Sequence, residues 1–265
     1  MAERHLGWTG APGELQSFGP RFTARVQLLD SVFRRQRPER ALDIGCGRGA
    51  ITRILARRAN RVVATEVSNE AVQAAAESLA DIDNVEVHLS NLFANTGQQP
   101  PFSGQHFNLV LLSEVLEHLE DDVGALRRIR QLLEDIGVLV ITVPRDPALW
   151  SVEDELWGHK RRYLRGDLIA KLGAAGFRTS TVWTWGFPLT RYLVLLQVWR
   201  LKRRTRANQD ASYDPIRLPH PLLHLARVSF TFIARFEQLF KRIDRGIGYI
   251  VVAEPMSDDV SFGKS

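Results

Sequence analysis

Between residues 41 and 143, short apolar runs alternate with segments that carry apolar side chains at helical spacing, and this alternation limits the folds open to the chain. The runs that predict strands span residues 41–45, 61–66, 85–89, 107–112 and 137–143. The segments that predict helices include residues 50–58, 69–79 and 121–133. Strands separated by helices favour a mainly parallel sheet with a helical layer on each face, and a ligand at the carboxyl ends of the strands.

The rest of the chain predicts two more strands and a long insertion. After a loop over residues 145–162, a helix is expected near 166–175, a strand at 177–185 and a last strand at 248–253. Residues 186–246 exceed the usual length of a connection, and apolar residues from Leu222 to Phe240 fall largely on one face of a helix. We therefore expect an α/β three-layer sandwich with a mainly parallel seven-stranded sheet and a helical insertion before the last strand.

We expect these elements to form one domain, because 265 residues can bury a single sizeable core. Its expected parts are an N-terminal helical segment (1–39), a ligand-binding core (40–143), a substrate-side loop, helix and strand (144–185), a basic helical insertion (186–246), and a last strand with a tail (247–265).

The positive charge of the chain is concentrated in the expected insertion. The net charge is +5 and the pI is near 9.7, but twelve Lys or Arg and only four Asp or Glu lie between Arg191 and Arg245. The aromatic residues of this segment fall on the apolar face of a helix instead of alternating with basic residues, so a nucleic-acid partner is not expected. A basic amphipathic insertion suits a cap on the sheet, a lid over an acceptor pocket, or contact with an anionic membrane.

The sequence also predicts where the protein works. Cys46 is the single cysteine, so no internal disulfide can form. The first thirty residues lack the pattern of a secretory signal, and the longest strongly apolar run, residues 192–199, is about half of the ~20 residues that a membrane-spanning helix needs. We expect a cytoplasmic protein, with peripheral contact at the inner membrane face as one option.

A glycine-rich turn follows the first expected strand, in the segment Asp43-Ile-Gly45-Cys-Gly47-Arg-Gly49. Glycines at such a turn let backbone amides and a bulky ligand approach each other closely. Glu66 ends the second strand, nineteen residues after Gly47, where a carboxylate can accept hydrogen bonds from both hydroxyls of a ribose. The spacing favours an adenosyl ligand but also satisfies a relaxed dinucleotide fingerprint, so it leaves the identity of the ligand open.

Four motifs in order resemble those of the class I S-adenosylmethionine-dependent methyltransferases: LDIGCGRG, VVATEVS, HLSNLF and LVLLSEVLEHL. The resemblance covers residues 41–143, and the later GHKRRY and AAGF stretches look like those of bacterial small-molecule, lipid or glycan methyltransferases. It implies a Rossmann-like fold, S-adenosylmethionine as cofactor, and methyl transfer to a small-molecule, glycan or lipid-precursor acceptor.

The resemblance also implies which residues bind the cofactor. They are Asp43, Gly45, Cys46, Gly47, Glu66, Val67, Asn91, Leu92, Ser113 and Glu114. Asp43 would contact the methionine end and Glu66 the ribose. Asn91 stands where the family commonly has an aspartate that binds the adenine amino group, and its amide oxygen can still accept a hydrogen bond. Ser113 and Glu114 would lie near the sulfonium.

Methyl transfer from a sulfonium needs alignment of donor and acceptor, and it needs a base only where the acceptor must lose a proton. His159, just past the fifth strand, is our candidate to take that proton from a hydroxyl, with His118 also suggestively placed. The alternative for His159 is a histidine that anchors its loop. Glu114, Glu117 and His118 are of metal-ligating types, but no further ligand completes a set in the sequence, so no metal is expected.

Two other functions compete with methyl transfer. The same sheet could serve an enzyme that depends on NAD or a nucleotide sugar, or it could be a non-catalytic scaffold that binds a partner or a membrane through the basic insertion. Tighter binding of reduced nicotinamide than of S-adenosylhomocysteine would favour the first. Cofactor binding without turnover on a broad acceptor panel would favour the second.

Overall fold

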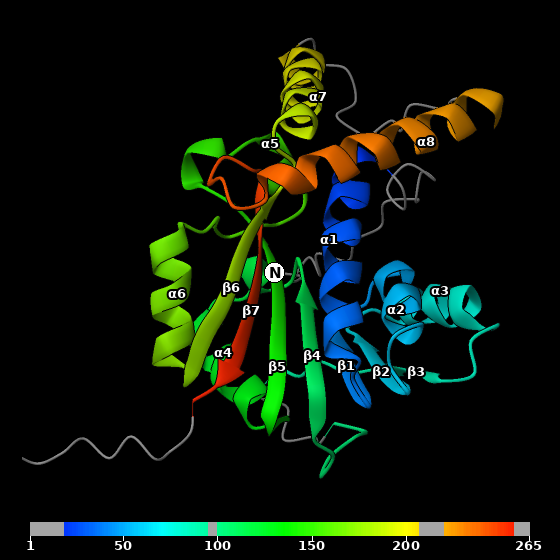
Figure 1. Ribbon diagram of the computed structural model, residues 1–265, viewed down its shortest axis with the longest axis vertical. Coiled ribbons are helices and arrows are strands. Elements are labelled where there is room, and N and C mark those ends of the chain that lie inside the picture. The colour runs from blue at the N-terminus through cyan, green and yellow to red at the C-terminus, as the bar shows by residue number, and fades with distance from the viewer. Residues whose placement is uncertain (1–18, 95–99, 207–219, 257–265) are drawn as a thin grey trace, which may run out of the picture.

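The computed structural model describes residues 19–94, 100–206 and 220–256, and a seven-stranded sheet organises them (Figure 1). The strand order is β3-β2-β1-β4-β5-β7-β6. The strands are β1 Arg40–Ile44, β2 Arg61–Glu66, β3 Val85–Leu89, β4 Phe107–Ser113, β5 Leu133–Pro144, β6 Phe177–Trp185 and β7 Gly248–Pro255. Neighbouring strands from β3 to β5 pair in parallel, and β7 runs antiparallel to β5 and β6. The expected mainly parallel seven-stranded sheet is confirmed.

Helices cover both faces of this sheet, because successive strand residues point to opposite sides. In β4, Leu109 and Leu111 pack in the cluster that contains the buried residues of α1 (Pro20–Gln36) and α2 (Ala50–Ala56). Val110 and Leu112 pack in the opposite cluster, with residues of α4 (Asp122–Arg130) and α6 (Arg165–Ala174). The helix α3 (Asn69–Leu79) packs beside β2 and β3. The strand order reverses between β1 and β4, so the loop after β1 opens at the switch point where ligands bind in such sheets.

The fifth strand begins earlier than expected. Its pairing with β4 moves from Phe107↔Leu133 to Leu109↔Val138, so the residues between Leu133 and Val138 bulge out of the ladder. The preceding helix α4 ends at Arg130 instead of reaching residue 133 as expected, because Leu132 already accepts a hydrogen bond from the amide of Phe107. The spacing of apolar residues alone does not show whether such a short apolar stretch is a helix or a strand.

The insertion contains α7 (Leu189–Arg206) and α8 (His220–Glu237) and connects the antiparallel strands β6 and β7. Its two ends are neighbours, because the amide of Ile247 donates to the carbonyl of Trp185 at 2.8 Å. The helix α8 packs mainly across α1 (Figure 1), and its Ala234 also lies in the core cluster that contains Trp183 and Trp185 of β6. Gln27 of α1 donates to the carbonyl of Thr231. The division into five parts remains a prediction, and residues 1–18, 95–99, 207–219 and 257–265 of its parts lie outside the described chain.

Candidate functional site

The loop between β1 and α2 takes a backbone path that needs glycine. Gly45 and Gly47 have φ values of +73° and +55°, in the left-handed region that side chains disfavour. The amides of Gly45 and Cys46 both donate to the carbonyl of Thr65 in β2. A Cβ added to Gly45 would stand 2.5 Å from a methyl carbon of Val115, so this turn is also closely packed.

Asp43 lies buried beneath this loop, with 1% of its surface exposed. The hydroxyl of Thr52 donates to Oδ2 of Asp43 at 2.7 Å. Burial raises the pKa of Asp43 to about 7, against the lowering effect of the Thr52 hydrogen bond, and the charge of Glu66 raises it further. Asp43 therefore changes its charge near neutral pH.

Burial also raises the pKa of the Cys46 thiol far above its usual range, so this thiol is not a nucleophile near neutral pH.

The carboxylate of Glu66 ties the loop to the end of β2. Its Oε2 accepts from the amide of Gly47 at 2.9 Å, and its Oε1 accepts from the amide of Val67 at 2.7 Å. Each carboxylate oxygen has two acceptor positions, so both can accept a further hydrogen bond from a ribose hydroxyl. Glu66 is thus held in place at the carboxyl end of the strand with acceptor capacity to spare.

A cavity of about 360 Å³ opens above the glycine loop. Six of the expected cofactor residues line it: Asp43, Gly45, Cys46, Gly47, Ser113 and Glu114. Residues of α1, among them Arg21 and Arg25, form another wall of this cofactor cavity. Glu114 has a φ of +58° and accepts a hydrogen bond from the hydroxyl of Thr142 at 2.8 Å, while Arg25 lies 3.3 Å from its carboxylate.

The other four expected cofactor residues lie outside the lining of this cavity, at the same edge of the sheet. Glu66 and Val67 end β2, and the carbonyl of Glu66 accepts from the amide of Ser90, directly before Asn91 and Leu92. The side chain of Asn91 closes its own turn, because its oxygen accepts from the amides of Phe93 and Ala94. Contact of these residues with a ligand stays a prediction.

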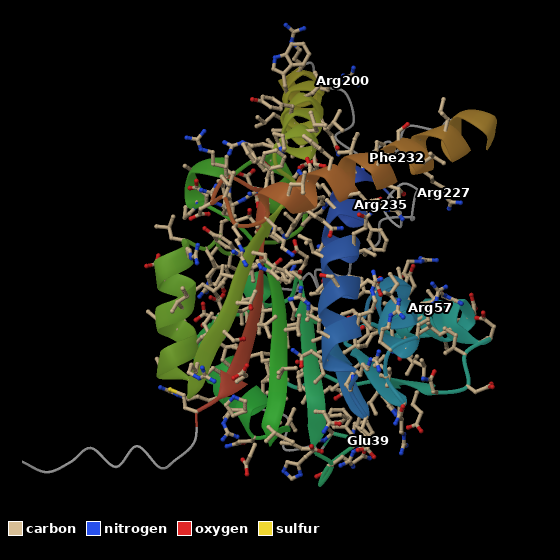
Figure 2. The ribbon with its side chains drawn as sticks, in the orientation of Figure 1. Glu39, Arg57, Arg200, Arg227, Phe232 and Arg235 are labelled. Atoms are coloured by element: carbon tan, nitrogen blue, oxygen red, sulfur yellow. The ribbon has the colours of Figure 1, made fainter. Side chains whose placement is uncertain are left out.

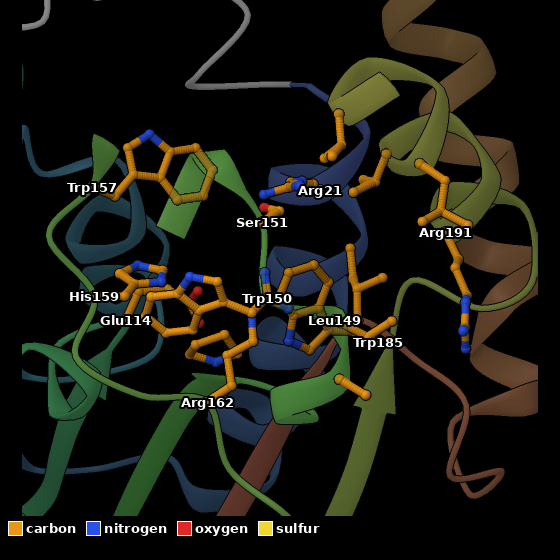
Figure 3. A pocket seen from close by; sticks show the side chains of 16 residues that line it. Arg21, Glu114, Leu149, Trp150, Ser151, Trp157, His159, Arg162, Trp185 and Arg191 are labelled. Atoms are coloured by element: carbon orange, nitrogen blue, oxygen red, sulfur yellow. The ribbon is translucent and has the colours of Figure 1, made fainter. Parts of the chain in front are cut away.

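A second cavity, of about 210 Å³, adjoins the first and carries three tryptophans, Trp150, Trp157 and Trp185. Part of its wall comes from α7, including Arg191 and Val194. Figure 3 shows His159 beside Glu114 on one side of this cavity and Arg191 on the opposite side. The residues that line both cavities are Arg21, Glu114, Trp157, His159 and Trp185. The junction of the two cavities is therefore the place where a donor and an acceptor can meet.

His159 is held at this junction by a buried ion-pair network. Its Nδ1 lies 2.9 Å from Oδ1 of Asp154, and Arg162 donates two hydrogen bonds to the same carboxylate at 2.8 Å. Burial alone would raise the pKa of Asp154, but the hydrogen bonds from His159 and Arg162 outweigh it and hold that pKa well below its usual range. The ionised carboxylate accepts the Nδ1 proton, which leaves Nε2 of His159 as the basic nitrogen.

Glu117 and His118 lie next to this network, on the 3₁₀ turn Leu116–His118. Glu117 is 0% exposed, and neither of its carboxylate oxygens has a hydrogen-bond partner among the described residues. Burial and the nearby charge of Glu114 raise its pKa well above the usual range. Nδ1 of His118 lies 3.3 Å from the carbonyl of Gly158, and Nε2 of His159 lies 3.8 Å from Oε1 of Glu117. The sequence offered no further ligand for Glu117 and His118, but the fold places His159 beside them.

Several functional positions escaped the sequence analysis. Asp154 and Arg162 orient His159, and Trp157 and Trp185 shape both cavities. One available signal was the helix start at Ser151, whose capping box includes Asp154. The role of Arg21 and Arg25 of α1 had no comparable signal, because it depends on how that helix crosses the switch point.

The observed site fits S-adenosylmethionine. The cofactor cavity lies within the usual range of about 300–1,000 Å³ for small-molecule sites. The glycine at position 47 leaves open space where any other residue would carry a Cβ. Asp43 lines the cavity, and Glu66 accepts a hydrogen bond from the amide of Gly47 in its lining, so two carboxyl groups near the cavity suit a positively charged ligand with ribose hydroxyls.

Known proteins are similar to this chain in sequence and in fold. Residues 42–139 match a family model described as a methyltransferase domain. The ubiquinone biosynthesis O-methyltransferase of Yersinia pestis (strain Pestoides F) is 28% identical over 113 residues, which are 42% of this chain and 46% of the relative. The chain therefore spans about half the length of the curated relatives it matches.

Two solved structures are similar in fold. The N-methyltransferase NodS from Bradyrhizobium japonicum WM9, in complex with S-adenosyl-L-homocysteine, matches 68% of this chain and 86% of its own, with a TM-score of 0.51 and 22% identity. The [4+2]-cyclase SpnF matches 87% of this chain and 81% of its own, with a TM-score of 0.56 and 20% identity. At these identities the likeness establishes the fold alone.

Proposed function

We propose that the chain, of which residues 42–139 match a methyltransferase-domain model, is a class I S-adenosylmethionine-dependent methyltransferase that methylates a hydroxyl oxygen of a small-molecule, glycan or lipid-precursor acceptor. The observation that supports this most directly is the junction of the two cavities, where Glu114 and His159 line both. One cavity adjoins the glycine loop and suits the cofactor. The other is lined by tryptophans and suits the acceptor.

When bound, S-adenosylmethionine supplies a methyl group that its sulfonium charge activates. The residues of the chain then have to align the two reactants and exclude water. Gly45 and Gly47 leave room for the methionine end, ionised Asp43 attracts its positive charge, and Glu66 holds the ribose hydroxyls. With these assignments, we expect the methyl group to lie toward Glu114 at the shared wall.

The acceptor cavity favours a molecule with an apolar or aromatic body. Trp150, Trp157 and Trp185 offer flat apolar surfaces, and Leu195 and Val198 of α7 extend that lining. His159 lines both cavities, and its Nε2 is not engaged by Asp154, so we propose that Nε2 takes the proton of the acceptor hydroxyl while Asp154 stabilises the protonated ring. The acceptor itself is not named by these contacts.

Calorimetric titration with S-adenosylmethionine and S-adenosylhomocysteine tests the cofactor. We expect micromolar binding to the wild type and a loss of about tenfold or more for Glu66→Ala, because two ribose hydrogen bonds disappear. Glu70→Ala, an exposed acid on α3, is the matched control and should bind as the wild type does. Tighter binding of reduced nicotinamide dinucleotide than of S-adenosylhomocysteine would overturn the proposal.

Turnover on a panel of hydroxylated acceptors tests the role of His159. His159→Gln should lower turnover by about 10²-fold with binding of S-adenosylhomocysteine intact, whereas His106→Gln, at an exposed position, should not change it. Unchanged turnover in His159→Gln would remove this residue from the mechanism. Cofactor binding by the wild type without turnover on any acceptor would favour the scaffold function instead.

We also propose that the insertion meets an anionic membrane and receives lipid-linked acceptors there. Figure 2 shows Arg227, Phe232 and Arg235 along α8, and Arg200 on α7. Phe232 is 65% exposed and Leu239 is 78% exposed, so apolar and basic side chains share this surface. None of the described helices has the length and apolarity needed to cross a membrane.

Co-sedimentation with vesicles tests this contact. We expect binding to vesicles that contain anionic lipid at low salt and little binding to neutral vesicles, because the attraction depends on charge. Phe232→Ser should weaken binding without unfolding the chain, since the side chain is exposed. Absence of binding to anionic vesicles at low salt would exclude membrane contact and leave methyl transfer unaffected.

A further inference from the structure

Three side chains beside the junction of the two cavities form a cluster with a composition suited to a metal ion, although only His159 lines both cavities. They are Glu117, His118 and His159, and their ligand atoms all lie within 4.8 Å of one another. We propose that this cluster binds one divalent transition-metal ion of the zinc class. The inference rests on the proposed function for its site but gives His159 a different role there, as a metal ligand, and its test does not depend on methyl transfer.

The buried carboxylate of Glu117 is the first observation that points to a cation. The residue is 0% exposed, and its two oxygens have no hydrogen-bond partner among the described residues. A buried carboxylate without hydrogen bonds costs several kcal/mol unless it is neutralised or a cation compensates it. Glu114 adds negative charge nearby, and Arg25 partly offsets it without contacting the Glu117 oxygens.

The orientation of the two histidines is the second observation. Nδ1 of His159 is engaged by the carboxylate of Asp154 at 2.9 Å, and Nδ1 of His118 lies 3.3 Å from the carbonyl of Gly158. A metal-ligating histidine almost always donates its other ring N–H to a carboxylate or a backbone carbonyl, because this fixes the tautomer that leaves the ligating nitrogen bare. Both histidines have such a partner, and both are left with Nε2 as the free nitrogen.

The spacing of the donors suits one ion after a small adjustment. Two donors that each lie about 2.1 Å from one ion are at most about 4.2 Å apart. Nε2 of His159 and Oε1 of Glu117 already meet this limit at 3.8 Å, and the widest pair needs to close by less than an ångström. Two imidazoles and one carboxylate favour Zn²⁺, Fe²⁺ or Co²⁺ over Mg²⁺ or Ca²⁺, which prefer oxygen ligands.

The position of the cluster gives the ion access to an acceptor. His118 and His159 line the cofactor cavity, and His159 also lines the acceptor cavity. Three protein ligands leave at least one coordination position open, as in catalytic sites. With an ion bound, Nε2 of His159 is a ligand and no longer the proton acceptor, and the ion itself lowers the pKa of a hydroxyl that binds to it. In the proposed function Nε2 of His159 binds the acceptor proton, whereas in this inference it binds the metal ion.

Metal titration of the full chain, after dialysis against a chelator, tests the inference. We expect Zn²⁺ to bind with a stoichiometry of one by calorimetry, and Co²⁺ to give a visible d–d absorption band from the same site. Glu117→Gln should lower the affinity at least tenfold, whereas Glu120→Gln, three residues further on and paired with Lys160 at the surface, should leave it unchanged.

A second variant, His118→Gln, and a second ligand, S-adenosylhomocysteine, distinguish loss of the metal site from loss of the fold. His118→Gln should also lower the affinity at least tenfold, and circular dichroism with S-adenosylhomocysteine titration establishes that each variant is folded. Failure of the wild type to bind Zn²⁺ or Co²⁺ while it binds S-adenosylhomocysteine overturns the metal site alone. Equal Zn²⁺ affinity of the wild type and both folded variants overturns it as well. Stoichiometric Zn²⁺ binding without any S-adenosylhomocysteine binding would overturn the proposed function and keep the metal site.

Discussion

The two glycines that begin the loop after β1 share a left-handed backbone but differ in their surroundings. A Cβ on Gly45 would stand 2.5 Å from Val115, whereas a Cβ on Gly47 would meet no atom within 4 Å. We predict that Gly45→Ala lowers the free energy of unfolding by about 2–4 kcal/mol, from backbone strain plus overpacking, and Gly47→Ala by about 1–2 kcal/mol from strain alone. Urea denaturation measures both. Equal losses would mean that Val115 moves away at no cost.

Asp43 makes stability depend on pH in a defined direction. Its pKa is about 7 in the folded chain and near 3.8 in the unfolded chain, so the folded state holds a proton that the unfolded state has released between about pH 4 and pH 7. The contribution of Asp43 to stability is therefore present at low pH and is lost as the pH rises through 7.

Asp43→Asn isolates this contribution, because asparagine can still accept the Thr52 hydrogen bond but does not titrate. Between pH 4.5 and pH 8, we predict that the free energy of unfolding of the variant rises relative to that of the wild type by a few kcal/mol, on the order of 1.4 kcal/mol for each unit of pKa shift. Urea denaturation at the two pH values gives the difference. Curves for the two proteins that run parallel with pH would show that Asp43 ionises normally.

At the residue scale, the sequence predicted the parts of the site that are local in the chain. Gly45, Gly47 and Glu66 belong to short motifs tied to strand ends, so spacing alone placed them together. The proximity of Glu117 to His159 was not predictable in this way. Glu117 lies 42 positions earlier in the chain, and only the path of the loop after β5 brings the two side chains to 3.8 Å.

At the element scale, α8 caps α7 with a buried side chain. Both oxygens of Glu237 accept hydrogen bonds from Thr190, one from its amide at 2.6 Å and one from its hydroxyl at 2.8 Å. A carboxylate at the first turn of a helix satisfies amides that lack intrahelical partners and complements the helix dipole. These hydrogen bonds connect the first turn of α7 to the last residue of α8.

We predict that Glu237→Ala lowers stability by about 1–2 kcal/mol and speeds amide exchange in the first turns of α7, while exchange in β4 and β5 stays unchanged. Hydrogen exchange followed by mass spectrometry measures this difference. Arg235→Ala, at an exposed position on the same helix, serves as the control. Slowed exchange in α7, or a matching increase throughout the sheet, would contradict a local capping role.

The loop between β5 and α6 depends on Asp154. This buried carboxylate accepts two hydrogen bonds from Arg162 and further ones from Ser151 and His159. We predict that Asp154→Asn costs about 3–5 kcal/mol, because it leaves the buried guanidinium of Arg162 uncompensated. Chemical denaturation measures the loss, with Glu155→Gln at an exposed neighbouring position as the control. A loss below 1 kcal/mol would mean that Arg162 finds another partner.

Element types were predictable where the pattern was long and regular. β2, α3 and β6 begin and end where the sequence analysis placed them, because each has clear apolar spacing and a defined boundary. The packing of α8 was not predictable, because an amphipathic pattern shows that a helix has an apolar side without saying which element covers it. The described part of α8 in fact leaves Leu225 and Phe232 exposed.

At the scale of the whole molecule, the position of the insertion in a hairpin makes it separable from the sheet. Trp185 and Gly248 are paired across β6 and β7, so a short turn can join the two strands. We predict that replacing residues 187–245 by such a turn leaves a chain that folds and binds S-adenosylhomocysteine within about tenfold of the full chain. The replacement should abolish turnover, because the α7 wall of the acceptor cavity is gone.

Calorimetry and an acceptor assay on the shortened chain measure the two effects separately. Complete loss of S-adenosylhomocysteine binding by a folded chain would mean that Gln197 of α7, which lines the cofactor cavity, is needed for the cofactor as well. Retained turnover would mean that the acceptor does not use the tryptophan-lined cavity.

The residues that line both cavities couple the binding of the two ligands. Arg21, Glu114 and Trp157 cannot move to accommodate one molecule without reshaping the space offered to the other. If binding of one ligand changes the affinity for the other by some factor, the second ligand must change the affinity for the first by the same factor, since coupling between two binding equilibria is reciprocal. Occupancy of one cavity therefore changes the affinity of the other through the side chains that the two cavities share.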